Sequence, residues 1–130
     1  MVSGLGFSPY SASKFAVVAM SEGLAMHLKP LGIGVSVLCP GWVRTRITES
    51  ARNRLERYGP TPTLDPASRA IMAQITGLVQ SGLDPSEVAA RVLAAIREDE
   101  LYVFTHPQMR GEIERRFGDI LAAMDKAAAR

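Results

Sequence analysis

Apolar side chains recur along this chain in two patterns, one typical of helices and one typical of buried strands. Near the amino terminus they fall three and four residues apart, which places them on one face of a helix. These residues are Val17, Met20, Leu24, Leu28 and Leu31. Residues 33–39 and 101–104 are short, mostly apolar runs bounded by glycine, proline or polar residues, as is typical of buried strands. The expected helices span residues 9–29, 47–58, 66–80, 84–97 and 109–124.

Proline and capping residues set the expected ends of these helices. Pro30 and Gly32 end the first helix, because proline cannot continue its hydrogen bonds. Asp84 followed by Pro85 is typical of a helix start, and Glu87 lies three residues after this cap, where its carboxylate can reach back. The order helix, strand, helices, strand, helix predicts an α/β fold with parallel strands joined by a right-handed crossover.

A second face of the first helix carries only small residues. They are Ala12, Ala16, Ala19 and Gly23. Small side chains let another backbone approach closely, so this helix is expected to pack on more than one side. Packing within one subunit and packing between two subunits both explain the pattern.

Length and composition exclude several classes of protein. The chain has 130 residues, of which 47% are hydrophobic and 22% charged, as expected for one soluble domain rather than two. Its one cysteine, Cys39, excludes an internal disulfide and favours a reducing compartment. A net charge of +2 is too small to indicate a nucleic-acid or membrane partner, and no segment is long and apolar enough to span a bilayer. A cytoplasmic location is therefore expected.

Charge is distributed unevenly along the chain. Residues 44–57 hold five arginines against two glutamates, whereas residues 84–100 hold five acidic residues against two arginines. Solvated helix faces explain both segments. For the basic segment, the alternative is an anion-facing loop beside a cofactor.

Tyr10 and Lys14 are the first residues that suggest chemistry. Four residues apart on a helix, their side chains leave the same face with Cβ atoms about 5–6 Å apart. An ammonium group at that distance favours phenolate over phenol, which suits a tyrosine to general acid–base work. A tyrosine and a lysine at this spacing also occur by chance, so the pair indicates a site only together with a second motif.

The second motif, PGWVRT at residues 40–45, directly follows the first expected strand. In open α/β sheets ligands bind at the carboxyl ends of the strands, so this loop is where a ligand is expected. Pro40 stiffens the chain, and Gly41 permits a close backbone approach. Backbone groups near Val43 and the hydroxyl of Thr45 are then able to bond an amide or a phosphate.

The motifs YSASK and PGWVRT, separated by one helix and one strand, together resemble the second half of the short-chain dehydrogenase/reductase family. The Tyr-x-x-x-Lys of that family matches Tyr10 and Lys14. Its Pro-Gly-x-Val-x-Thr matches Pro40, Gly41, Val43 and Thr45. The resemblance implies a partial Rossmann-like fold, a doubly wound parallel sheet of which this chain holds the last two strands and their helices.

The resemblance also implies a role for each matched residue. Tyr10 would donate a proton to a substrate carbonyl in reduction, or accept one in oxidation, while Lys14 would bond the nicotinamide ribose and favour ionisation of Tyr10. The loop 40–45 would hold the nicotinamide of NAD or NADP. Within it, Val43 would offer backbone bonds to the carboxamide, and Thr45 would contact the carboxamide or the pyrophosphate.

Further implications concern the substrate and the assembly. Residues 47–82 would form a lid over a small carbonyl or alcohol substrate, and Trp42 would line the pocket, although simple packing explains Trp42 equally well. The helix 9–29 corresponds to one that commonly joins subunits in this family, so a homo-oligomer is implied. His27 and His106 have no partners at metal-binding spacing, so no metal site is expected.

Several features of the family are missing from the sequence. It has no glycine-rich turn after a strand to cradle the pyrophosphate, no residue beside such a turn to choose NAD or NADP, and no serine at the active-site position of the family. Residues 1–130 are therefore expected to form a single incomplete domain, the carboxyl-terminal catalytic and substrate part of a longer oxidoreductase, inactive and prone to aggregate alone. The alternative is a catalytically inactive remnant or a helical interaction module that needs a partner to complete its sheet.

Overall fold

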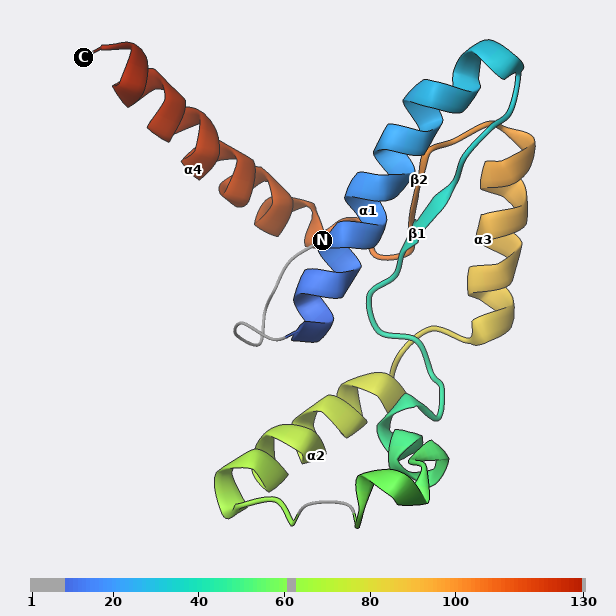
Figure 1. Ribbon diagram of the computed structural model, residues 1–130, viewed down its shortest axis with the longest axis vertical. Coiled ribbons are helices and arrows are strands. Elements are labelled where there is room, and N and C mark those ends of the chain that lie inside the picture. The colour runs from blue at the N-terminus through green and yellow to red at the C-terminus, as the bar shows by residue number, and fades with distance from the viewer. Residues whose placement is uncertain (1–8, 61–62, 130) are drawn as a thin grey trace.

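The computed structural model describes residues 9–60 and 63–129 (Figure 1). The α-helices are α1 (Pro9–Leu28), α2 (Pro66–Gln80), α3 (Pro85–Arg97) and α4 (Arg110–Ala128). The strands are β1 (Val37–Cys39) and β2 (Tyr102–Phe104). Short 3₁₀ helices are η1 (Lys29–Leu31), η2 (Ile47–Asn53), η3 (Glu56–Tyr58) and η4 (Pro107–Met109). Apart from the segment 47–58, every expected helix is present with ends close to those predicted.

β1 and β2 pair in parallel, as the order of elements predicts, in a register that sets Val37 opposite Tyr102. The strands are shorter than the apolar runs that predict them. Only three residues of the expected strand 33–39 belong to β1, because β2 offers only three residues to pair with. Ile33 is 52% exposed and Leu38 is 40% exposed, so the prediction of a wholly buried strand is wrong.

The core is small and is formed by both strands together with α2 and α3. Its buried hydrophobic residues are Val37, Val79, Val88, Ala95 and Val103. α1 contributes no buried residue, and its apolar face is open, with Met20 67% and Leu24 49% exposed. No helix within the described residues is long and apolar enough to cross a membrane.

α3 begins at its predicted cap. The carboxylate of Asp84 accepts hydrogen bonds from the backbone N–H and the hydroxyl of Ser86, at 2.9 and 2.6 Å. Glu87, expected to reach back toward the cap, instead accepts a hydrogen bond from Arg91 one turn further on, at 2.6 Å. The start of α3 is therefore fixed by the aspartate, and the glutamate stabilises the body of the helix.

The segment between β1 and α2 departs from its prediction. A continuous helix is expected over 47–58, but η2 and η3 are separate turns divided by extended backbone at Arg54 and Leu55. Arg54 supports this shape, because its guanidinium donates to the carbonyl groups of Tyr58 and Gly59 at 2.5 and 3.0 Å. A side chain that bonds to main-chain carbonyls in this way competes with the regular helical pattern.

Candidate functional site

Tyr10 and Lys14 lie on the first turns of α1 and face the same side of it. The ammonium nitrogen of Lys14 is 5.2 Å from the centre of the Tyr10 ring, so a positive charge lies against the aromatic face. The hydroxyl of Ser13 donates to the Tyr10 carbonyl at 2.7 Å and closes this first turn. Because Tyr10 is 61% exposed, the structure presents the pair on an open face.

The loop 40–45 is held at its start by the residues that follow β2. The N–H of Gly41 donates to Oγ1 of Thr105 at 3.0 Å, and Thr105 is only 2% exposed. The ring of His106 packs on the same glycine, since a Cβ at Gly41 would lie 2.6 Å from its Cγ and Nδ1 atoms. The close approach that the sequence predicts at Gly41 is thus made by a side chain of the protein itself.

Further along, the loop 40–45 pairs with Leu83 in a parallel bridge. The backbone N–H of Leu83 donates to the Trp42 carbonyl at 3.0 Å, and the backbone N–H of Arg44 donates to the Leu83 carbonyl at 2.9 Å. Neighbouring residues of an extended chain direct their N–H and C=O groups to opposite sides, so those of Val43 point away from Leu83. Gly82 lies so close that a Cβ there would be 2.5 Å from the Trp42 carbonyl.

An ion pair joins the loop 40–45 to the start of α3. Nη2 of Arg44 lies 2.6 Å from Oδ2 of Asp84. Hydrogen bonds from Ser86, and then the one from Arg44, lower the pKa of Asp84 to about 2. Both partners of the pair are exposed, so the pair orients the loop more than it stabilises the fold. Thr45, the next residue, is exposed.

The Tyr10 and Lys14 pair and the loop 40–45 lie at the same end of the sheet. α1 runs in the opposite direction to β1, so its first turn lies toward the end where β1 finishes (Figure 1). This carboxyl end of parallel strands is where α/β proteins bind their ligands. The geometry therefore gathers the two motifs at the end of the sheet that suits a site.

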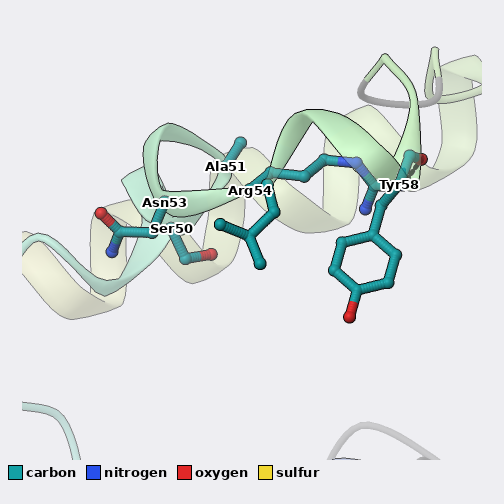
Figure 2. Close-up of a pocket in the computed structure, with 6 residues that line it drawn as sticks. Ser50, Ala51, Asn53, Arg54 and Tyr58 are labelled. Carbon is teal, nitrogen blue, oxygen red and sulfur yellow. Dashed lines mark hydrogen bonds between the residues drawn. The ribbon is translucent and has the colours of Figure 1, made fainter.

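A separate open hollow of about 440 Å³ lies over η2 and η3 (Figure 2). Its lining residues are Ser50, Ala51, Asn53, Arg54, Leu55 and Tyr58. The guanidinium groups of Arg54 and Arg57 lie 5.9 and 4.9 Å from the centre of the Tyr58 ring. Arg54 is the one charged residue among those lining residues, and within the described part of the chain neither arginine forms an ion pair with a carboxylate. Neither motif lines the hollow.

Four residues support the loop 40–45 although the sequence-based prediction gives them no such role. They are Gly82, Leu83, Thr105 and His106. For the last two a signal exists: in a parallel sheet the ends of both strands meet at one edge, so residues just after β2 lie beside those just after β1. His106 is weighed in the sequence only as a metal ligand, and Gly82 and Leu83 belong to no recognisable motif.

Within the described residues, this region contains neither an activated cysteine nor a metal-binding cluster. Cys39 ends β1, and burial raises the pKa of its thiol. A raised pKa keeps the sulfur protonated and weakly nucleophilic. Among residues 9–60 and 63–129, no cluster of three or more His, Cys, Asp or Glu side chains could hold a metal ion.

Comparison with known proteins connects these features to one family. A family model described as short chain dehydrogenase matches residues 1–56, which include both motifs. A C alpha-dehydrogenase of Sphingobium sp. is 31% identical, over 87% of this chain and 36% of its own length. A CLA biosynthesis dehydrogenase/reductase of Lactiplantibacillus plantarum is 30% identical, over 85% of this chain and 41% of its own length.

A solved structure shows the same relationship in three dimensions. The crystal structure of a short chain dehydrogenase/reductase from Burkholderia phymatum, in complex with NAD, matches with a TM-score of 0.84 and 33% identity. The match covers 94% of this chain and 44% of that one. The chain belongs to the short-chain dehydrogenase/reductase family and has part of its α/β Rossmann fold, as the two motifs predict. It spans less than half the length of these relatives.

Proposed function

We propose that this chain carries the acid–base pair and the nicotinamide-facing loop of an NAD- or NADP-dependent oxidoreductase that interconverts a carbonyl and an alcohol. The observation that carries the proposal is the contact between Lys14 and Tyr10 on the open face of α1, at the end of the sheet where the loop 40–45 emerges. The names of the relatives, which are dehydrogenases and reductases, support the same class of reaction.

Tyr10 is the proposed proton carrier. In reduction, a hydride adds to the carbonyl carbon of the substrate, and the Tyr10 hydroxyl gives its proton to the carbonyl oxygen, so an alcohol forms and a phenolate remains; oxidation reverses both transfers. The Lys14 ammonium favours that phenolate and so eases release of the proton. The hydride is supplied or accepted by a nicotinamide dinucleotide when one is bound.

The residues of this chain fit the nicotinamide end of such a cofactor. The N–H and C=O of Val43 lie on the side of the loop away from its bridge, and they match the acceptor and donor groups of a carboxamide. Lys14 would bond the ribose, and Thr45 would bond the carboxamide or the pyrophosphate. Pro40 and Gly41 set the path of the loop. The NAD bound in the relative from Burkholderia phymatum supports this choice of cofactor.

Trp42 and residues 47–82 form the proposed substrate side of the site. The segment contains η2, η3 and α2, and its hollow is lined by both polar and apolar groups (Figure 2). Arg54 and Arg57 have no carboxylate partner among the described residues, which supports the interpretation of the basic segment 44–57 as an anion-facing loop.

The substitution Tyr10→Phe tests the proposal. In a full-length enzyme that contains these residues, we expect NADH-dependent reduction across a panel of aldehydes and ketones to fall about 10²–10⁴-fold, the usual contribution of a positioned general acid, while NADH affinity changes little. Affinity is followed by the fluorescence of Trp42, the one tryptophan of the chain. Tyr102→Phe is the matched control, because it removes a hydroxyl that donates at 2.5 Å to Glu22, which lies on a later turn of α1 than Tyr10. Unchanged turnover in Tyr10→Phe removes Tyr10 from its proposed role.

The second candidate is a non-catalytic module that docks on a partner able to complete its sheet. The observations that favour it are the open apolar face of α1 and a described sheet of only two strands. Titration of the folded chain with NADH separates the two proposals. Saturable quenching of Trp42 supports the oxidoreductase, and absence of any response supports the module.

A further inference from the structure

Thr105 is the centre of a set of contacts that joins the ends of β1 and β2. It is buried, and its Oγ1 accepts the N–H of Gly41 at 3.0 Å and lies 2.7 Å from Nδ1 of His106. The carbonyl of Thr105 accepts from Nη1 of Arg91 at 2.9 Å, which fixes the residue from the α3 side. Because a hydroxyl carries one proton and two lone pairs, the Thr105 hydroxyl is able to bond Nδ1 of His106 and accept the N–H of Gly41 at the same time.

The ring of His106 completes this support from a second direction. Its contact with the backbone of Gly41 leaves no room for a side chain at that position. Movement of the loop toward the ring is therefore blocked by contact, and movement away from Thr105 breaks a part-buried hydrogen bond. Two residues beyond Gly41, the chain presents the backbone groups of Val43.

We propose that Thr105 and His106 are positioning residues that hold Gly41 so that the backbone of Val43 faces the nicotinamide. The role in cofactor binding rests on the proposed function, whereas the control of the loop 40–45 does not. When the contacts of Thr105 and His106 with Gly41 are lost, the loop occupies its binding geometry for a smaller fraction of the time. The apparent cofactor affinity is proportional to that fraction, so it falls as well. The proton chemistry of Tyr10, on α1, is left in place.

The substitution Thr105→Val tests the proposal, because valine keeps the shape of the side chain and removes its hydroxyl. We expect the NADH dissociation constant, followed by Trp42 fluorescence, to rise about tenfold, as the loss of one hydrogen bond worth about 1.4 kcal/mol predicts. In a full-length enzyme that contains these residues, turnover at saturating NADH is expected to change less than the KM for NADH. The emission of Trp42 without NADH is expected to shift, since Trp42 follows Gly41. Thr105→Ser keeps the hydroxyl and should restore both the NADH dissociation constant and the Trp42 emission of the parent chain.

Ser36→Ala is the matched control. The hydroxyl of Ser36 donates to the Glu100 carbonyl at 2.7 Å, across the same two strands but at their opposite end, and over the same separation of 64 residues. Thermal unfolding of each variant reports any general loss of stability. The proposal is overturned if Ser36→Ala weakens NADH binding as much as Thr105→Val does, or if Thr105→Val leaves Trp42 emission unchanged. A parent chain that does not bind NADH contradicts the proposed function instead, and Trp42 emission still decides the role of Thr105.

Discussion

At the scale of single residues, the contacts of the glycines distinguish positions that require glycine from positions that merely contain it. A Cβ at Gly41 would meet the ring of His106, and a Cβ at Gly82 would meet the backbone of Trp42. Gly77, inside α2, has nothing within 4 Å of the place a Cβ would take. The first two glycines therefore hold the loop 40–45 in place, and the third is free to change.

The substitution Gly82→Ala is expected to lower the free energy of unfolding by about 1–3 kcal/mol, because the added Cβ would meet main-chain atoms that cannot move aside without distorting the loop. It should also shift Trp42 emission. Gly77→Ala is the matched control, expected to raise stability by about 0.5–1 kcal/mol because alanine is the better helix former. Urea unfolding measures both changes. Equal stability of the two variants would contradict the close contact at Gly82.

At the scale of elements, Asp84 joins two parts of the chain that are distant in sequence. It caps α3 through Ser86 and pairs with Arg44 of the loop 40–45. The sequence predicts the cap, because an aspartate directly before a proline is typical of a helix start. The ion pair depends on the parallel bridge that brings Val43 beside Leu83. One residue thus links a helix start to the candidate site.

The lowered pKa of Asp84 predicts a dependence of stability on pH. Because the carboxyl has a pKa of about 2 in the folded chain against an ordinary value of 3.8, its contribution is complete above about pH 4 to 5 and is lost as the pH falls toward 2. Asp84→Asn keeps a capping oxygen but does not titrate. We expect the thermal midpoint of the parent chain to fall more steeply over this acid range than that of the variant. Parallel curves would show that Asp84 does not contribute in this way.

At the scale of the whole molecule, the described chain covers its sheet unevenly. α2 and α3 contribute buried side chains, whereas α1 and α4 contribute none. In Figure 1, α4 extends away from the other elements. Near its start it contacts α1, where the guanidinium of Arg116 lies 5.1 Å from the centre of the Phe15 ring. Exposed apolar helix faces of this kind favour association.

The open face of α1 predicts self-association of the 130-residue chain, and the family resemblance implies a homo-oligomer through the same helix. We expect the double substitution Met20→Gln and Leu24→Gln to reduce association measured by sedimentation velocity, because it removes apolar surface that is 67% and 49% exposed. Leu55→Gln is the control, since Leu55 is 54% exposed but lies between η2 and η3. A parent chain that is monomeric and unfolds cooperatively contradicts the prediction.

The sequence by itself determined most of the helices and the identity of the family. α1 begins at Pro9, and α3 follows the Asp84 cap, because proline, capping side chains and apolar spacing act over only a few residues. The spacing of Tyr10 and Lys14 likewise places them on one helix face without help from the rest of the chain. The parallel order of the strands followed from the sequence of elements.

Only the tertiary structure decided the length of the strands, the shape of the segment 47–58 and the support of the loop 40–45. In a two-stranded sheet each strand extends only over residues that pair with the other strand, and an apolar run in the sequence does not reveal how long its partner is. The hydrogen bond from Gly41 to Thr105 joins residues 64 positions apart, so no local sequence pattern predicts it. Contacts of this kind depend on how two strands meet in space, and they hold the loop whose residues the family motif identifies.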